Sequence, residues 1–319
     1  MSSVVALASP VVIQAWREPQ NEKLQHFAAE LKLIADACSS RGVAFHVVEW
    51  RDRDRLLALV PCAITPLTAW DYINHFDEIF RDVFDDAVLG PHVQNATQIL
   101  KFNGNKRYLL ELEKHDVSIV PSLVLSSDDS ATIFRAGFAH FESEDRLVFK
   151  PAVGAGAWKQ VSMQRAEHTA EHVQRLIAEG EAPSGDVIVQ PFLPTVSSMG
   201  EVSLLFFDGQ LSHAVLKKPK AGDYRVQHAF GGSVALHTPS AAELASAQQV
   251  MEVVARLCGG RTPAYARVDF MFSESGAPLL GEIELFEPYL YLREGNAGEE
   301  AVEAATQRLV DALLKRSSV

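Results

Sequence analysis

The chain has 319 residues, of which 47% are hydrophobic, and its formal net charge is -12. This length and apolar content suffice for two or three packed units of a globular protein. The acidic balance argues against a general binder of nucleic-acid backbones, because such binders need an excess of Lys and Arg. No apolar run approaches the roughly 18 residues that span a bilayer. We therefore expect a soluble, cytoplasmic protein that binds neither nucleic acid nor membrane.

The three cysteines are far apart in the sequence. Cys38, Cys62 and Cys258 have neither a disulfide-framework nor a zinc-ligand spacing. We interpret them as small buried side chains.

The first 95 residues have the pattern of a small α/β domain. Residues 4–16 supply one or two β-rich runs, and apolar residues then recur at helical spacing up to Gly42. A β-rich run at 43–50 follows, which completes a β-α-β unit, and residues 72–84 have a second helical pattern. Such an order predicts a parallel sheet.

From about residue 100 the pattern changes to helices and antiparallel strands. A helix is predicted at 104–116 and a strand at 118–125. After a polar link, short runs at 146–151, 158–163, 186–193, 202–209 and 211–219 read as paired strands. Ser240 and Glu243 form a capping box for a helix that ends at Gly259 and Gly260, and residues 297–316 form an amphipathic helix. We predict domains at 1–95, 96–190 and 191–319.

Three acids lie in a predicted hairpin near the C-terminus. The strand-like segments 266–272 and 278–285 flank a turn, and a turn centred between Ser275 and Gly276 puts Asp269 opposite Glu282, with Glu284 on the same face. Unneutralised carboxylates this close would repel each other by on the order of 4 kcal/mol per pair. An oxygen-only set favours Mg²⁺ or Mn²⁺. The alternative is a solvent-exposed acidic face on an edge hairpin.

A glycine-rich loop follows the predicted strand that ends at Lys150. Gly154 and Gly156 would let backbone N–H groups approach phosphate oxygens, and the lysine would add a positive charge. An ordinary glycine-rich hairpin is the alternative. Lys106 and Arg225 are further candidate phosphate ligands, whereas Lys217, Lys218 and Lys220 read more readily as a solvated basic loop.

Seven segments together resemble the ATP-grasp ligases, especially the branch with bacterial glutathione synthetase and the D-cycloserine-forming ligase. In chain order they are NKRYLL, FKPAVGAGA, VIVQPFLP, GEVSLLFFDG, KKPKAGDYRVQHAFGGS, RVDF and GEIELFEP. The N-terminal TAWDYINHF resembles a further segment of the cycloserine-type branch. The resemblance implies an α/β (α+β) ATP-grasp fold with an N-terminal α/β domain, a glycine-loop lid and a C-terminal antiparallel domain that carries the metal site.

The resemblance also implies roles for individual residues. Lys106 and Lys150 would reach the ATP phosphates, with the loop from Gly154 to Gly156 closing over them. The adenine would meet the segment Val189, Gln190, Pro191, Phe192 and Leu193, and Glu201 would bind the ribose. Arg225 would face the transferring phosphoryl group, and Asp269, Glu282 and Glu284 would hold Mg²⁺ or Mn²⁺.

The substrate is expected between the first domain and the metal hairpin. Trp70, Asp71 and Tyr72 are candidates on one side and Tyr289, Tyr291 and Arg293 on the other, while Glu287 is a substrate-side candidate because Pro288 turns the chain away from the strand. The family chemistry implied is C–N bond formation on a small amino-acid-like substrate through an acyl phosphate. An ATP-binding sensor or scaffold and a phosphotransferase without ligation are the alternatives. Members of this family are often dimers, which leaves a homodimer open.

Two departures from the family pattern affect the substrate prediction. The metal motif ends in Glu284 where the family often has Asn. The carboxylate of Glu284 would still provide a metal ligand. Ser203 stands where glutathione synthetase has an arginine. The loss of that cation argues against glutathione synthetase chemistry.

Overall fold

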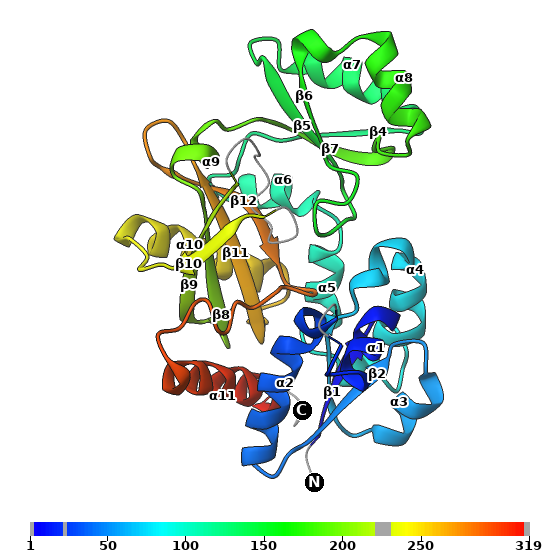
Figure 1. Cartoon of the computed structure of the whole chain (residues 1–319), viewed down its shortest axis with the longest axis vertical. Helices are drawn as coiled ribbons and strands as arrows, with labels where there is room; N and C mark the ends of the chain where they lie inside the picture. Colours follow the sequence, from blue (N-terminus) through cyan, green and yellow to red (C-terminus); the bar gives the residue numbers. More distant parts are fainter. Residues whose placement is uncertain (1–2, 22–23, 221–230, 316–319) are drawn as a thin grey trace.

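The computed structural model describes residues 3–21, 24–220 and 231–315. The strands of these residues form three sheets that follow one another along the chain. In Figure 1 the four-stranded sheet lies at one end of the molecule, the five-stranded sheet in the middle and the three-stranded sheet at the other end. The domain boundaries at 95 and 190 stay predictions. None of the helices in the described ranges is long and apolar enough to cross a membrane.

The N-terminal sheet is parallel, as the β-α-β pattern predicts. Strand β1 (Ser3–Ala8) lies between β2 (Ala44–Glu49) and β3 (Ala63–Thr68), and α2 (Gln25–Ser40) joins β1 to β2. All six residues of β1 are buried, which explains why this strand is a continuous apolar run.

A second β-run before residue 16 was a wrong prediction. The segment after β1 is the helix α1 (Pro10–Arg17). Ser9 has an extended backbone and Pro10 is the first helical residue, where its fixed φ favours a helix start and its missing N–H is not needed. Val12 and Ala15 are buried, three residues apart on one side of the helix.

Short helices lead from this sheet to the rest of the chain. The helical pattern at 72–84 becomes a series of short turns rather than one helix. In chain order, all the short helices between residues 53 and 113 are α3 (Arg53–Leu59), η1 (Trp70–Asn74), α4 (Phe76–Ile79), η2 (Phe80–Phe84), η3 (Gly90–His92), α5 (Thr97–Asn103) and α6 (Tyr108–Glu113).

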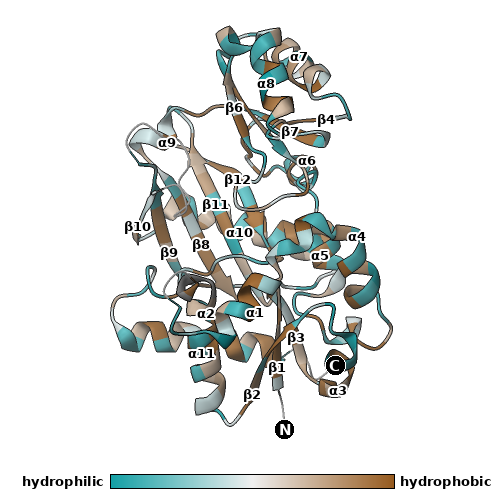
Figure 2. Ribbon diagram, turned by 45° about the vertical axis from the view of Figure 1, so that its right-hand side comes forward, coloured by the Kyte–Doolittle hydropathy of each residue, from teal (hydrophilic) through white to brown (hydrophobic). Residues whose placement is uncertain are grey.

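The four-stranded sheet is antiparallel and carries the glycine-rich loop. Its order is β4 (Leu123–Ser127), β7 (Gly185–Pro191), β5 (Arg146–Pro151) and β6 (Val161–Gln164), with η4 (Arg165–Glu167) after β6. Two helices, α7 (Ser130–His140) and α8 (Ala170–Ala178), were not predicted. Figure 2 shows apolar strands beneath these two helices, whose faces are partly hydrophilic. The polar link before α7 contains its cap, because the Asp129 side chain accepts hydrogen bonds from the Ala131 and Thr132 amides.

The five-stranded sheet is also antiparallel. Its order is β10 (Ser233–Leu236), β9 (Gln210–Lys218), β8 (Glu201–Phe207), β11 (Tyr265–Phe272) and β12 (Pro278–Glu284). The short helix α9 (Thr195–Ser198) precedes β8. The helix α10 (Ala241–Leu257) begins with the predicted Ser240 and Glu243 capping box and packs on the apolar side of β11 and β12. The other side of that hairpin faces the cavity described below.

The C-terminal part of the chain packs against the N-terminal sheet. Helix α11 (Glu299–Lys315) lies beside α2 (Figure 1), and the Arg41 guanidinium pairs with Asp311 at 3.0 Å. The segment after β12 also reaches this unit, since the Phe286 ring stacks on Tyr72 with centroids 4.2 Å apart. Residues that follow the hairpin are therefore fixed by the first ninety residues of the chain.

Candidate active site

One cavity of about 520 Å³ brings most of the predicted site residues together. Its lining comes from the glycine-rich loop, the end of β7, one face of β11 and β12, Trp70 and the segment after β12. The predicted residues that line it are Trp70, Lys106, Lys150, Gly154, Gly156, Gln190, Pro191, Phe192, Leu193, Glu201, Asp269, Glu282, Glu284, Glu287, Tyr289 and Tyr291.

The glycine-rich loop is tied to the hairpin through Lys106. This lysine is 8% exposed, and its Nζ donates to the Gly154 carbonyl at 2.5 Å and pairs with Glu282 at 2.9 Å. Gly156 has φ near +58°, a backbone conformation that costs other residues about 1 kcal/mol or more. No atom of the described residues lies within 4 Å of a Cβ placed there, so the loop is open above this glycine.

Lys150 differs from Lys106 in having no fixed partner. Within the described residues, no carboxylate lies within ion-pair distance of its ammonium group, although it lines the same cavity. Burial lowers the pKa of Lys150, the positive charge of Lys106 lowers it further, and Glu282 and the other nearby acids offset these effects only in part. This cation would gain from a negatively charged ligand.

The segment after β7 supplies the apolar wall. Gln190 is 2% exposed, and its amide donates to the Ser122 hydroxyl at 2.8 Å. The Arg146 guanidinium lies 4.0 Å from the centre of the Phe192 ring. The side chain of Val189 packs in the core of the four-stranded sheet and does not line the cavity.

The hairpin has the register that the sequence predicts at its acids. Asp269 lies directly opposite Glu282, and Arg267 lies opposite Glu284. The register shifts by one residue at Gly281, between these pairs and the turn. The turn is thus centred on Ser275, half a residue from the predicted centre, and the bulge restores the predicted pairing.

Each of the three acids has a cationic neighbour. Lys106 pairs with Glu282, and Arg267 donates to both Asp269 and Glu284. Lys217 pairs with Glu201 and lies 3.5 Å from Asp269. The cations neutralise most of the repulsion that the carboxylates would otherwise suffer.

The pKa values of the acids diverge because of these partners. Burial alone would raise the pKa of Asp269, but Arg267 and Lys217 hold it below its ordinary value. Lys106 and Lys150 do the same for the pKa of Glu282. For Glu284, burial and the neighbouring acids outweigh Arg267, so its pKa is raised.

Two residues of this network were missed or misread from the sequence. Arg267 was not singled out, although it stands two positions before Asp269 and so shares its strand face. The interpretation of Lys217 as part of a solvated loop was wrong. Strand β9 continues to Lys218, and the alternation along it turns Lys217, 3% exposed, toward Glu201 while Lys218 is exposed.

Ser203 takes part in the same network. It lies opposite Asp269 and its hydroxyl donates to that carboxylate. Arg267 of the adjacent strand β11 supplies a cation to the same carboxylate.

Some predicted residues lie away from the cavity. Asp71 accepts hydrogen bonds from Trp50 and Arg51, each at 3.0 Å, and Tyr72 is buried against Phe286. Arg293 is exposed and pairs with Glu299 at 2.9 Å. Arg225 lies outside the described residues.

A divalent cation suits the donor chemistry of the hairpin. Within the described ranges, no group of three or more His, Cys, Asp and Glu residues is arranged to hold a metal ion. Mg²⁺ needs fewer protein ligands, since it is usually bound by one or two carboxylates plus substrate phosphates and water. Glu282 and Glu284 are two residues apart on one strand face and line the cavity beside Lys150, so they fit this smaller ligand set.

Comparison with known proteins gives the family. No family model matches the sequence. The chain is 27% identical over 292 residues to the cycloserine biosynthesis protein DcsG of Streptomyces lavendulae, covering 86% of this chain and 92% of that protein. The crystal structure of D-cycloserine synthetase DcsG has a TM-score of 0.76, with 22% identity and full coverage of both chains. The chain belongs to the ATP-grasp ligase superfamily.

More distant relatives agree with this assignment. The ATP-grasp ligase PsnB, solved with a minimal precursor, Mg and ADP, has a TM-score of 0.60 at 14% identity, covering 99% of this chain and 98% of PsnB. The glutathione synthetase of Prochlorococcus marinus (strain MIT 9313) is 32% identical over 114 residues, which are 36% of this chain and 34% of that protein. The predicted ATP-grasp fold is confirmed over the whole chain.

Proposed function

We propose that the chain is an ATP- and Mg²⁺-dependent carboxylate–amine ligase for a small amino-acid-derived substrate. The observation that carries this proposal is the shared cavity, whose lining combines the hairpin acids, a glycine-rich loop and Lys150, a cation with no carboxylate partner among the described residues. A nucleotide phosphate chain fits between them, because it offers Lys150 the negative charge that the described residues do not. The similarity to DcsG favours a reaction in which the amide bond forms within one substrate molecule and gives a cycloserine-like product.

Lys106, Lys150, the glycine-rich loop, Gln190 and Glu201 line the part of the cavity that we call the nucleotide end. These residues would bind and orient ATP. Lys106 and Lys150 would bind the phosphates, the backbone around Gln190 the adenine, and Glu201 the ribose. Mg²⁺ bound there would neutralise charge on the phosphates. Glu282 and Glu284 are the residues that would hold it, with Asp269 beside them.

Trp70, Tyr289 and Tyr291 line the part of the cavity that we call the amino-acid end. These residues would position the two reacting groups of the substrate. A substrate carboxylate oxygen attacks the γ-phosphorus, ADP leaves, and the substrate amine then attacks the acyl carbon and expels phosphate while losing a proton. Arg267 and Lys217 also line the cavity, and cations at such positions stabilise charge that develops on transferring oxygens. The enclosed site would protect the acyl phosphate from water. The role of Arg225, facing the phosphoryl group, stays a prediction.

The test is ADP release in the presence of ATP and Mg²⁺ with a panel that includes O-ureidoserine and D-alanine. We expect ADP release that depends on an added amino-acid compound, together with a new C–N bond detected by mass spectrometry. ADP release with a phosphorylated product and no C–N bond would identify a phosphotransferase. Nucleotide binding without turnover of any compound would favour a sensor or scaffold and refute the ligase.

Three further properties stay predictions. They are the ability of Mn²⁺ to replace Mg²⁺, a homodimeric assembly and a cytoplasmic location. Metal titration of ADP release and light scattering of the purified protein test the first two directly.

A further inference from the structure

The segment Tyr289–Leu292, which follows the acidic hairpin, has an unusual backbone. Tyr291 has φ near +48°, in the left-handed region that a non-glycine residue seldom adopts. Such a conformation persists only where the surrounding contacts fix it.

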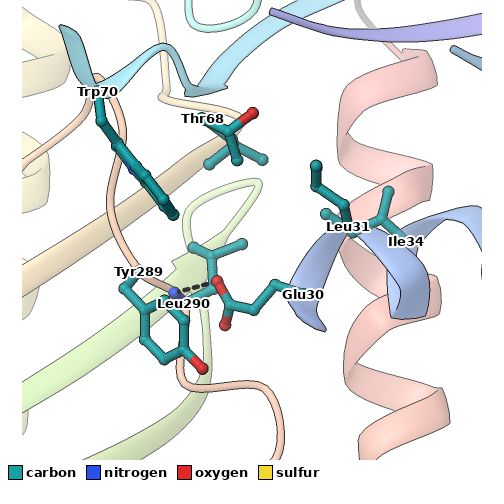
Figure 3. A pocket seen from close by; sticks show the side chains of 8 residues that line it. Glu30, Leu31, Ile34, Thr68, Trp70, Tyr289 and Leu290 are labelled. Carbon is teal, nitrogen blue, oxygen red and sulfur yellow. Dashed lines mark hydrogen bonds between the residues drawn. The ribbon is translucent and has the colours of Figure 1, made fainter. Parts of the chain in front are cut away.

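Glu30 of α2 is one of these contacts, and it comes from the opposite end of the sequence. Its Oε2 accepts the Leu290 amide at 2.9 Å and its Oε1 accepts the Leu292 amide at 3.2 Å. One carboxyl group thus binds the residues on both sides of Tyr291. Figure 3 shows Glu30 extending from its helix to the Leu290 amide, with Trp70 and Tyr289 nearby.

The segment is also held from the five-stranded sheet. Arg267 donates to the Tyr289 carbonyl at 3.2 Å. His213 lies 2.7 Å from the Leu290 carbonyl, and because a carbonyl only accepts, the His213 Nε2 carries the proton. The sheet therefore binds the carbonyl groups of this segment, while Glu30 binds its amides.

The position of the segment determines the wall at the amino-acid end of the cavity. The rings of Tyr289 and Tyr291 both line the cavity and meet edge to face, with centroids 5.0 Å apart. The Tyr291 ring also lies 5.9 Å from the Lys217 ammonium and 5.7 Å from the Arg267 guanidinium. A shift of this backbone would move two aromatic walls and change the surroundings of both cations.

We propose that Glu30 is a positioning residue of the amino-acid subsite: by binding the amides on both sides of Tyr291, it fixes the two tyrosines that contact the substrate. This inference rests on the proposed function for the identity of the substrate. Glu30 itself does not line the large cavity. It lies beside a separate cavity of about 10 Å³, so its effect on the substrate passes through the segment.

The surroundings of Glu30 are mostly apolar, which distinguishes it from a surface acid. Burial raises the pKa of Glu30 to about 8, against the opposing effect of the two amides. Glu294 raises this pKa further, Arg267 lowers it, and the Tyr289 hydroxyl is the other titratable group close by. The side chains and backbone around the small cavity are those of Leu31, Ile34, Leu67, Thr68, Trp70, Tyr289 and Leu290.

The test compares Glu30→Ala and Glu30→Gln with Asp36→Asn, a control on the same helix whose exposed carboxylate pairs only locally, with Lys32. Amide exchange of Leu290 and Leu292 is measured by NMR, together with the KM values for ATP and for O-ureidoserine or D-alanine, whichever releases ADP. We expect Glu30→Ala to speed both exchange rates about tenfold or more and to raise the amino-acid KM about tenfold. The KM for ATP should stay within about twofold. Glu30→Gln, which keeps one acceptor oxygen, should be intermediate, and Asp36→Asn should match the unchanged protein.

Two results would overturn the proposal. One is unchanged exchange at Leu290 and Leu292 in Glu30→Ala. The other is a parallel rise of both KM values, which would indicate general loosening of the fold. If the unchanged protein releases no ADP with any compound, the proposed function fails, and the exchange rates alone then decide whether Glu30 holds the segment.

Discussion

The two ends of the cavity are built in different ways. At the nucleotide end the glycine-rich phosphate-binding part is a single short stretch of chain, since Lys150 and the glycines of its loop lie within a few residues of each other. The amino-acid end combines Trp70 from the first unit with Tyr289 and Tyr291, which Glu30 and Arg267 hold from different elements. A binding site formed by one short segment suits a ligand that is common to a superfamily. A site assembled from distant segments can change with the substrate.

The largest effect is expected where the two ends meet. Glu282→Gln should lower Mg²⁺-dependent ADP release about a thousandfold or more, because it removes a metal-ligand charge and half of the Lys106 ion pair. The exposed Glu274→Gln, in the turn of the same hairpin, should have no effect. Circular dichroism checks that both variants fold, and turnover retained by folded Glu282→Gln would refute the metal assignment.

At the nucleotide end, we expect Lys150→Met to reduce ADP release about a hundredfold. The cause is the loss of a cation that, among the described residues, has no carboxylate partner and so is free to bind phosphate. Lys218→Met, in an exposed position on β9, is the matched control. Equal activity of the two variants would remove Lys150 from the nucleotide site.

At the amino-acid end, Glu30 should make stability depend on pH. Its folded pKa of about 8 lies above the ordinary value of 4.5, so between these values the unfolded chain loses a proton that the folded chain keeps. Stability should therefore fall by on the order of 3 to 4 kcal/mol as the pH rises from about 5 to 8. Glu30→Gln should remove the part of the slope that Glu30 causes and leave the part due to Glu284, whose pKa is also raised. An unchanged slope in urea unfolding series would contradict the assignment.

The smallest effect is expected at Arg293. Its guanidinium is exposed and pairs with Glu299 outside the cavity, so Arg293→Ala should change the KM for the amino-acid substrate less than about twofold. Trp70→Ala, which removes a cavity wall, should raise the same KM at least about tenfold. If Arg293→Ala matched Trp70→Ala, the boundary drawn here for the amino-acid end would be wrong.

The sequence predicted those features that depend on local patterns. The parallel N-terminal sheet, the Ser240 capping box and the pairing of Asp269 with Glu282 follow from periodicity and turn chemistry. Helix α7 was missed because its cap, Asp129, lies in a stretch of Ser and Asp that also suits a linker.

The site residues that were misread are those fixed by distant partners. The KKPK pattern around Lys217 resembles a basic loop, and only the pairing of β9 with β8 reveals that its side chain faces Glu201. Glu30 gives no local signal at all, because its partners are backbone amides 260 and 262 residues away. Backbone groups have no residue-specific pattern, so their partners cannot be found from one sequence.

The bulge at Gly281 decides which residues of β12 can reach the cavity. Side chains alternate between the two faces of a strand, yet Leu280 packs in the core and Glu282 lines the cavity. The extra residue reverses the phase of the alternation. If pairing instead ran regularly through Gly281, Glu282 and Glu284 would point into the hydrophobic core and Ile283 into the cavity. Deleting Gly281 should therefore keep both acids on the cavity side, because Glu282 would then follow Leu280 directly on the opposite face of the strand.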